Sequence, residues 1–207
     1  MKAFPAAMAI IDTETTGMRP PYSRVIDIGI IRVEGGVEVE RYQTLVNPQS
    51  SVPAFISDMT SITDADLVDA PTFDEVAIQV EELLKEAVFV AHNVGFDYAF
   101  IQSEFRRLDM HFRAPTLCSA ALSRALYPHQ RRHNLDALIQ RHDLVIDGRH
   151  RALPDADAVW QFFQKIGSDV SERRLRDAVG RKLNIKDRVT KFSEACSDEP
   201  VITYYEE

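Results

Sequence analysis

The chain has 207 residues, of which 45% are hydrophobic and 27% charged, and a formal net charge of −8, as expected for a soluble domain with a short appendage. No apolar run approaches the ~20 residues of a membrane helix, and the first residues lack a secretory-signal pattern, so we expect a cytoplasmic protein with no membrane partner. Only two cysteines, Cys118 and Cys196, argue against a disulfide framework or a cysteine metal site. The acidic net charge argues against a nucleic-acid partner only if the carboxylates hold no metal ions, because bound cations reverse the local electrostatic field.

The first third of the chain predicts a β-meander. Residues 7–12 are typical of a buried strand, and residues 25–33 of a second one. A tight turn at Glu34-Gly35-Gly36 then leads into a third strand over residues 37–46. Residues 56–67 are polar and predict small helical turns.

Helices and short strands alternate in the middle of the chain. Thr72 and Glu75 form a capping box for a helix that reaches Lys85, and a strand is expected over residues 88–91. A helix follows, whose expected apolar side consists of Phe96, Phe100, Ile101, Phe105 and Leu108.

The pattern continues with a strand over residues 114–117 and a helix that stops before Pro128. Further helices are expected at 135–141, capped by Asn134, and within 150–165. A meander followed by alternating helices and strands predicts an α/β fold, with a central mixed sheet flanked by helices. His111, His129, His133 and His142 are expected at the surface.

The composition changes after residue 167. Residues 172–191 contain eight lysines or arginines, and residues 193–207 are acidic without a basic residue. We therefore predict one domain over residues 1–167, and a basic helical appendage with an acidic tail over residues 168–207. This appendage would contact a phosphate backbone, dock a partner protein, or pack on the domain as a solvated amphipathic helix.

Asp12 and Glu14 are the first candidate functional residues. They follow an apolar run at a spacing of two, so in an extended chain both side chains point the same way. Two like charges held that close repel each other, unless a cation such as Mg²⁺ or Mn²⁺ lies between them. The alternative is an ordinary polar strand end that turns at Thr15-Thr16-Gly17.

Three later residues complete the candidate set. Asp97 lies where a predicted strand passes into a helix. His150 and Asp155 are five residues apart, which is more than one helical turn, so His150 is expected on the loop before the helix that carries Asp155. Four carboxylates and one histidine at the ends of separate elements can converge on one cleft.

Residues 11–17 (IDTETTG), 92–97 (HNVGFD) and 150–156 (HRALPDA) resemble, in order, the three motifs of the DEDDh, or DnaQ-like, 3′–5′ exonucleases. This family includes the proofreading epsilon subunit of bacterial DNA polymerase III. The resemblance covers residues 7–165 and implies a ribonuclease-H-like fold. It also implies two divalent cations, Mg²⁺ or Mn²⁺, with Asp12 bridging both. Glu14 and Asp155 would complete one ion site, Asp97 would support the other, and His150 would be the general base.

The expected substrate is single-stranded nucleic acid, with DNA 3′ ends favoured and nucleoside 5′-monophosphates as products. Trimming of RNA or short oligoribonucleotides is the enzymatic alternative, and a binding or scaffold protein without chemistry is the third hypothesis. A polymerase or repair partner would bind through residues 168–207. The candidate substrate-binding residues, each of which also fits a plain turn or core position, are Thr15, Thr16, Gly17, His92, Asn93 and Phe96.

Overall fold

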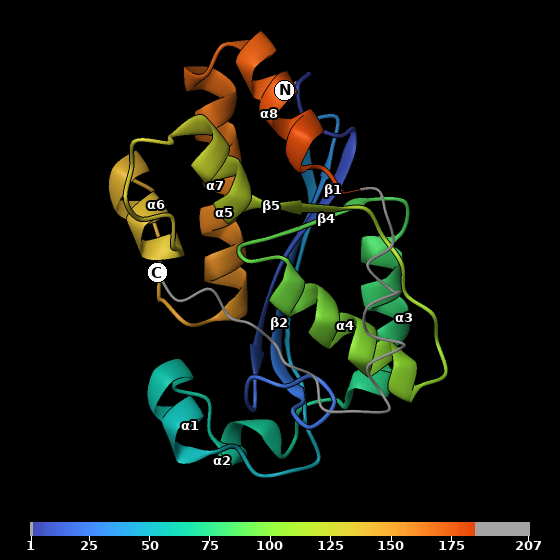
Figure 1. Cartoon of the computed structure of the whole chain (residues 1–207). Coiled ribbons are helices and arrows are strands. Elements are labelled where there is room, and N and C mark those ends of the chain that lie inside the picture. Colours follow the sequence, from blue (N-terminus) through green and yellow to red (C-terminus); the bar gives the residue numbers. More distant parts are fainter. Residues whose placement is uncertain (1, 185–207) are drawn as a thin grey trace, which may run out of the picture.

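The computed structural model describes residues 2–184 and contains a five-stranded mixed sheet of strand order β3-β2-β1-β4-β5 (Figure 1). The strands are β1 (Ala7–Thr15), β2 (Val25–Glu34), β3 (Val37–Leu45), β4 (Val88–Ala91) and β5 (Thr116–Cys118). The helices are α1 (Ala54–Thr60), α2 (Asp64–Leu67), α3 (Phe73–Leu84), α4 (Gly95–Arg107), α5 (Ser119–Leu126), α6 (Leu135–His142), α7 (Ala152–Asp169) and α8 (Glu172–Lys182). The predicted fold class is confirmed.

The predicted meander forms the antiparallel half of the sheet. β2 pairs with both β1 and β3, and the turn between β2 and β3 has positive φ at Gly35 and Gly36, a conformation that glycine adopts without strain. β1 extends to Thr15, three residues beyond the predicted strand, because β2 continues to pair with it up to Val25. β4 and β5 then add parallel strands on the other side of β1.

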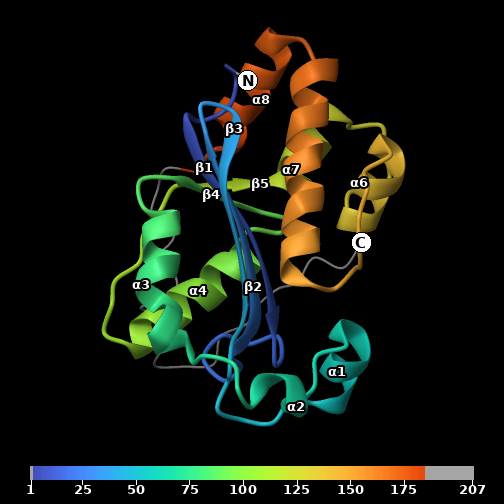
Figure 2. The ribbon, with the colours of Figure 1, turned by 180° about the vertical axis from the view of Figure 1, so that it is seen from behind.

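Each face of the sheet is covered by its own helices (Figures 1 and 2). Met8 and Ile10 of β1 point into a core that contains α5, α6, α7 and α8. Their neighbour Ile11 points to the opposite face, into a core with α3 and α4. Because both faces are buried, β1 has the continuous apolar sequence that was predicted, rather than an alternating one.

A small third cluster lies at the end of the sheet where β1 ends and β2 begins. Ile26 of β2 packs there against Ile56 of α1 and Leu67 of α2. The two short helices thus form a rim beside the end of β1 (Figures 1 and 2).

Helix α8 packs on the domain. Leu175, Ala178 and Val179 are buried in the same core as α5 and α7, while the arginines of α8 stay exposed. The predicted domain boundary after residue 167 falls within α7 and stays a prediction. The rest of the predicted appendage, residues 185–207, lies outside the described residues. Within residues 2–184, no helix combines the length and the apolar character needed to cross a membrane.

Candidate active site

The candidate acids gather beyond the ends of two parallel strands. β4 pairs with β1 only from Met8 to Ile10, so Asp12 and Glu14 extend past the last residue of β4, Ala91. The chain leaves β4 through a short turn and enters α4, whose first turn carries Asp97. Parallel strands end at the same edge of a sheet, and ligands of open α/β sheets bind at that edge.

Asp97 is hydrogen-bonded directly to β1. Its Oδ1 atom accepts a hydrogen bond from the backbone N–H of Thr13, at 3.0 Å, and a second from the Thr13 hydroxyl, at 2.9 Å. These two bonds hold the Asp97 carboxylate against β1, and its charge lies near enough to Asp12 and Glu14 to raise the pKa of both.

The start of α7 is pressed against β2. A Cβ atom on Gly29 would lie 2.3 Å from the backbone nitrogen of Leu153, so only glycine allows this approach. The fully buried Asp27 accepts hydrogen bonds from the Ala152 N–H at 3.2 Å and from Arg151 Nε at 2.8 Å. Gly29 pairs with Asp12 in the sheet, so this docking brings the first turns of α7 over the strand that carries the acids.

His150 lies on the loop before α7, as predicted. It has φ of +58°, in the left-handed region that histidine adopts more readily than most residues. Its side chain is exposed, and one of its ring nitrogens lies within 4.8 Å of carboxylate oxygens of both Glu14 and Asp155. The structure therefore brings residues from β1, the α6–α7 loop and α7 to one point.

The four carboxylates form one buried cluster. Glu14, Asp97 and Asp155 are each at most 8% exposed, and Asp12 is partly buried. Burial raises the pKa of Asp12, and the nearby charges of Asp97, Asp155 and Glu14 raise it further. Burial also raises the pKa of Glu14 to about 8 and that of Asp97 to about 7. Such crowding of acids is costly unless cations neutralise it.

These residues fit a divalent metal centre. Glu14, His150 and Asp155 offer ligand atoms close to one another, and hard cations such as Mg²⁺ and Mn²⁺ prefer carboxylate oxygens. Among the described residues, the buried Oδ1 atom of Asp155 has no hydrogen-bond partner, which leaves it available as a ligand. Its Oδ2 atom contacts Arg149, whose guanidinium also contacts Asp136 and supplies positive charge to the acid cluster.

The raised pKa values predict an unusual pH dependence for the metal-free protein. Above about pH 7, where the buried His92 is neutral in both the folded and the unfolded chain, folded Glu14 and a part of folded Asp97 still hold protons that the unfolded chain has released. The free energy of unfolding should therefore fall as the pH rises from about 7 to about 8. Thermal unfolding in EDTA across this range measures the effect, and Mg²⁺ should restore the melting temperature at the alkaline end. A melting temperature in EDTA that rises with pH in wild-type protein would contradict the assignment.

The predicted loop at Thr15, Thr16 and Gly17 borders the acid cluster. The Thr15 hydroxyl donates to the carbonyl oxygen of Gly17 at 2.7 Å, and the Thr16 hydroxyl accepts from the Arg24 N–H at 2.9 Å. Both side chains therefore fix the shape of the loop. A role of this loop in binding a nucleotide stays a prediction.

The other three candidate substrate-binding residues follow β4: His92 and Asn93 lie in the turn before α4, and Phe96 lies in the first turn of α4. His92 shares a hydrogen bond with Ser119, at 2.9 Å from Nδ1, and burial lowers its pKa to about 4, so the ring is neutral near pH 7. Asn93 is exposed and has φ of +61°. Phe96 is partly exposed and packs on the buried Phe100, with ring centroids 4.8 Å apart. Their contact with substrate stays a prediction.

The prediction from sequence missed the residues that hold the acids in place. Neither Arg149 nor Asp27 was among the candidate residues. Glu104 could have been recognised from the sequence, because it is an acid on the apolar side of α4, seven residues after Asp97. An acid in such a position is expected to be buried and therefore to have a partner.

Fold and site together define a ribonuclease-H-like nuclease domain. The family model for "exonuclease", of the RNase T type, matches residues 9–163, so the chain belongs to this exonuclease family, whose members are DnaQ-like. The DNA polymerase III subunit epsilon of Aquifex aeolicus is 36% identical over 158 residues, which are 76% of this chain and 78% of that protein. The DNA polymerase III PolC-type of Bacillus cereus is 32% identical over 179 residues, which are 83% of this chain but 12% of that much longer protein.

Two solved structures support the fold. Exonuclease X in complex with 5′-overhanging duplex DNA has a TM-score of 0.64 at 24% identity, covering 84% of this chain and 99% of that chain. The nuclease domain of 3′hExo, a DEDDh family member bound to rAMP, has a TM-score of 0.70 at 18% identity, covering 82% of this chain and 95% of that chain. The exonuclease fold implies dependence on a divalent metal.

Proposed function

We propose that the chain is a metal-dependent 3′–5′ exonuclease that hydrolyses phosphodiesters at single-stranded or frayed DNA 3′ ends and releases nucleoside 5′-monophosphates. The observation that carries this proposal is the convergence of Glu14, His150 and Asp155 on one point beside Asp12 and Asp97. A polar strand end without chemistry would not require acids from three separate elements.

The carboxylates would hold two divalent ions, Mg²⁺ or Mn²⁺. Asp12 would contact both ions, Glu14 and Asp155 would complete one site, and Asp97 would support the other. When bound, the ions supply charge neutralisation for the scissile phosphate and its leaving oxygen. Thr13 positions the Asp97 carboxylate, and Asp27 positions the first turn of α7, which carries Asp155.

His150 would act as the general base. A histidine side chain is the group that most often accepts the proton of an attacking water molecule in enzymes. Its exposure lets a water molecule and a DNA end reach the ring. The neighbouring Arg149 adds a positive charge that would favour the approach of a phosphate.

DNA is the favoured substrate, because relatives at 32% and 36% identity are named as DNA polymerase III proteins. The same names support the proposal that residues 168–207 bind a polymerase or repair partner. The exposed arginines of α8 leave a basic surface for such a contact, or for a phosphate backbone.

A substrate panel tests the proposal. We expect purified protein with Mg²⁺ to shorten single-stranded DNA and mismatched duplex ends faster than paired ends, because the 3′ end must separate from its partner strand to enter the site. Faster shortening of matched RNA oligonucleotides would replace the DNA assignment by the exoribonuclease alternative. Binding of nucleic acid without any shortening in Mg²⁺ or Mn²⁺ would instead identify a scaffold protein.

A further inference from the structure

Glu104 is a buried acid that lies outside the metal cluster. It is on α4, two helical turns after Asp97 and therefore on the same side of the helix, and it is only 2% exposed. A buried carboxylate is stable only when it is paired and hydrogen-bonded, so its partners show what this position does.

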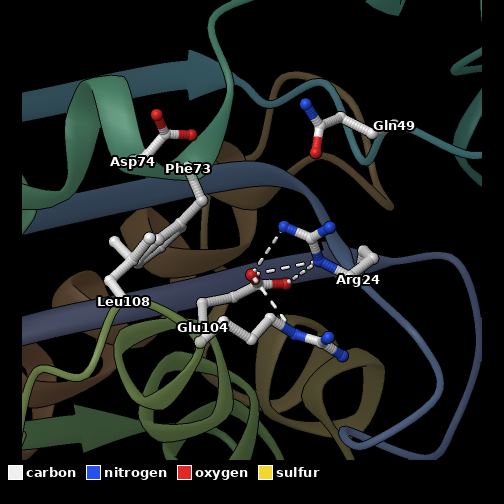
Figure 3. Close-up of a pocket in the computed structure, with 7 residues that line it drawn as sticks. Arg24, Gln49, Phe73, Asp74, Glu104 and Leu108 are labelled. Carbon is white, nitrogen blue, oxygen red and sulfur yellow. Dashed lines mark hydrogen bonds and ion pairs between the residues drawn. The ribbon is translucent and has the colours of Figure 1, made fainter.

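Arg24 is the main partner of Glu104 (Figure 3). Its guanidinium forms a fork on the carboxylate, with Nε 2.8 Å from Oε1 and Nη2 2.9 Å from Oε2. Glu104 Oε1 also accepts the backbone N–H of Val25 at 3.2 Å, and Arg24 Nη1 donates to the carbonyl oxygen of Pro48 at 3.1 Å. The partly buried Arg24–Glu104 ion pair, here called the joint, therefore connects α4, the start of β2 and the loop after β3.

The backbone of Arg24 holds the loop at the end of β1. The Thr16 N–H donates to the Arg24 carbonyl oxygen at 2.8 Å, and the Arg24 N–H donates to the Thr16 hydroxyl at 2.9 Å. Two bonds in opposite directions leave Thr16 little freedom to move relative to Arg24. The position of Thr16 is thus set by the residue whose side chain is anchored on Glu104.

Two more residues of α4 attach the same loop. The Ser103 hydroxyl donates to the Pro20 carbonyl oxygen at 3.0 Å, and Arg107 Nη2 donates to the Pro21 carbonyl oxygen at 3.0 Å. Residues 16–24 are therefore hydrogen-bonded to α4, the helix that also carries Asp97.

We infer that Arg24 and Glu104 are positioning residues. They hold the loop at Thr15–Gly17, where the terminal nucleotide would bind, in a fixed position relative to the metal-binding acids, because the same helix α4 carries both Glu104 and Asp97. The inference rests on the proposed function, because it takes this loop as the place where the terminal nucleotide binds. Asp97 itself is held by Thr13, so loss of the joint should displace the loop and leave the acids in place.

The test compares Glu104→Gln and Arg24→Lys with wild-type protein. Glutamine keeps the shape but loses the charge, and lysine keeps the charge but loses the fork. We expect kcat/KM on single-stranded DNA to fall about 10-fold to 100-fold in Glu104→Gln, mainly through KM, since a displacement of ~1 Å can cost about 10²-fold. Arg24→Lys should shift KM in the same direction by less. Affinity for dTMP, measured calorimetrically with Mg²⁺, should fall in parallel, while Mn²⁺ affinity should stay unchanged.

Arg32→Lys is the matched control. Arg32 lies at the far end of β2 and pairs with Glu34 and with carbonyl oxygens of Leu83 and Lys85. This variant should keep wild-type kinetics. Hydrogen exchange of the Thr16 and Arg24 amides should accelerate in Glu104→Gln and Arg24→Lys but not in Arg32→Lys.

The outcomes separate the inference from the proposed function. If wild-type protein neither shortens DNA nor binds dTMP, the proposed function fails, while hydrogen exchange still reports whether the joint holds the loop. Faster exchange with unchanged KM and dTMP affinity would overturn the positioning role and leave a purely structural ion pair. If Glu104→Gln does not fold, Arg24→Lys decides alone, and wild-type KM in that variant would overturn the inference.

Discussion

Asp12→Asn should reduce exonuclease turnover by about 10³-fold or more, because it removes the carboxylate proposed to contact both metal ions. Asparagine has nearly the same shape and keeps one oxygen, so the fold should survive. The same change removes one of four crowded acids, whose burial and mutual repulsion raise the pKa of Asp12. In EDTA at alkaline pH the variant should therefore melt at a higher temperature than wild-type protein, whereas its stabilisation by Mg²⁺ should be lost.

Asp69→Asn is the matched control for this prediction. Asp69 is exposed, lies between α2 and α3, and is not among the charges that shift the pKa of Asp12 or Glu14, so this variant should keep wild-type turnover and Mg²⁺ stabilisation. Full digestion of DNA by Asp12→Asn would show that the site has been assigned to the wrong residues. A lower melting temperature in EDTA at alkaline pH would contradict the account of charge crowding.

The second large effect is expected from His150→Gln, which should lower kcat by about 10²-fold to 10⁴-fold, the usual contribution of a general base. Substrate affinity should be preserved, because the acids and the loop at Thr15–Gly17 remain. The measurement is kcat on single-stranded DNA at saturating Mg²⁺, together with Mn²⁺ affinity of the same preparation.

His129→Gln serves as the control, because His129 is exposed in the loop between α5 and α6. It should leave kcat unchanged. A His150→Gln variant with weakened Mn²⁺ binding, and with normal kcat once the metal saturates the site, would contradict the role as base. Such a result would make His150 a metal ligand, which its distance from Glu14 and Asp155 also allows.

Much of the fold follows from local chemistry that the sequence displays. The capping box of Thr72 and Glu75 forms as predicted, and Asn134 accepts the Ala137 N–H at the start of α6. The expected apolar side of α4 is confirmed at Phe100, which is fully buried. Each of these signals lies within a few neighbouring residues, where propensity and side-chain spacing determine the conformation.

The order and type of the candidate residues along the chain predicted that they converge on one site. The residues that hold them in place were not predicted. The Arg24–Glu104 pair joins residues 80 positions apart, and Arg151 reaches Asp27 over 124 positions. No local pattern specifies such pairs, because they depend on how the helices pack on the sheet. The prediction that His142 lies at the surface was wrong, since it is 8% exposed between Tyr127 and Phe162.

We propose that the acids and His150 form a metal-dependent site that removes nucleotides from a 3′ end. The most direct measurement follows two copies of one single-stranded DNA, labelled at the 5′ end or at the 3′ end, during incubation with wild-type protein and Mg²⁺. We expect immediate release of the 3′ label as a mononucleotide, a ladder of shortening 5′-labelled strands, and no reaction in EDTA. Release of the 5′ label before the 3′ label, internal cleavage, or digestion that continues in EDTA would contradict the proposed 3′–5′ exonuclease activity.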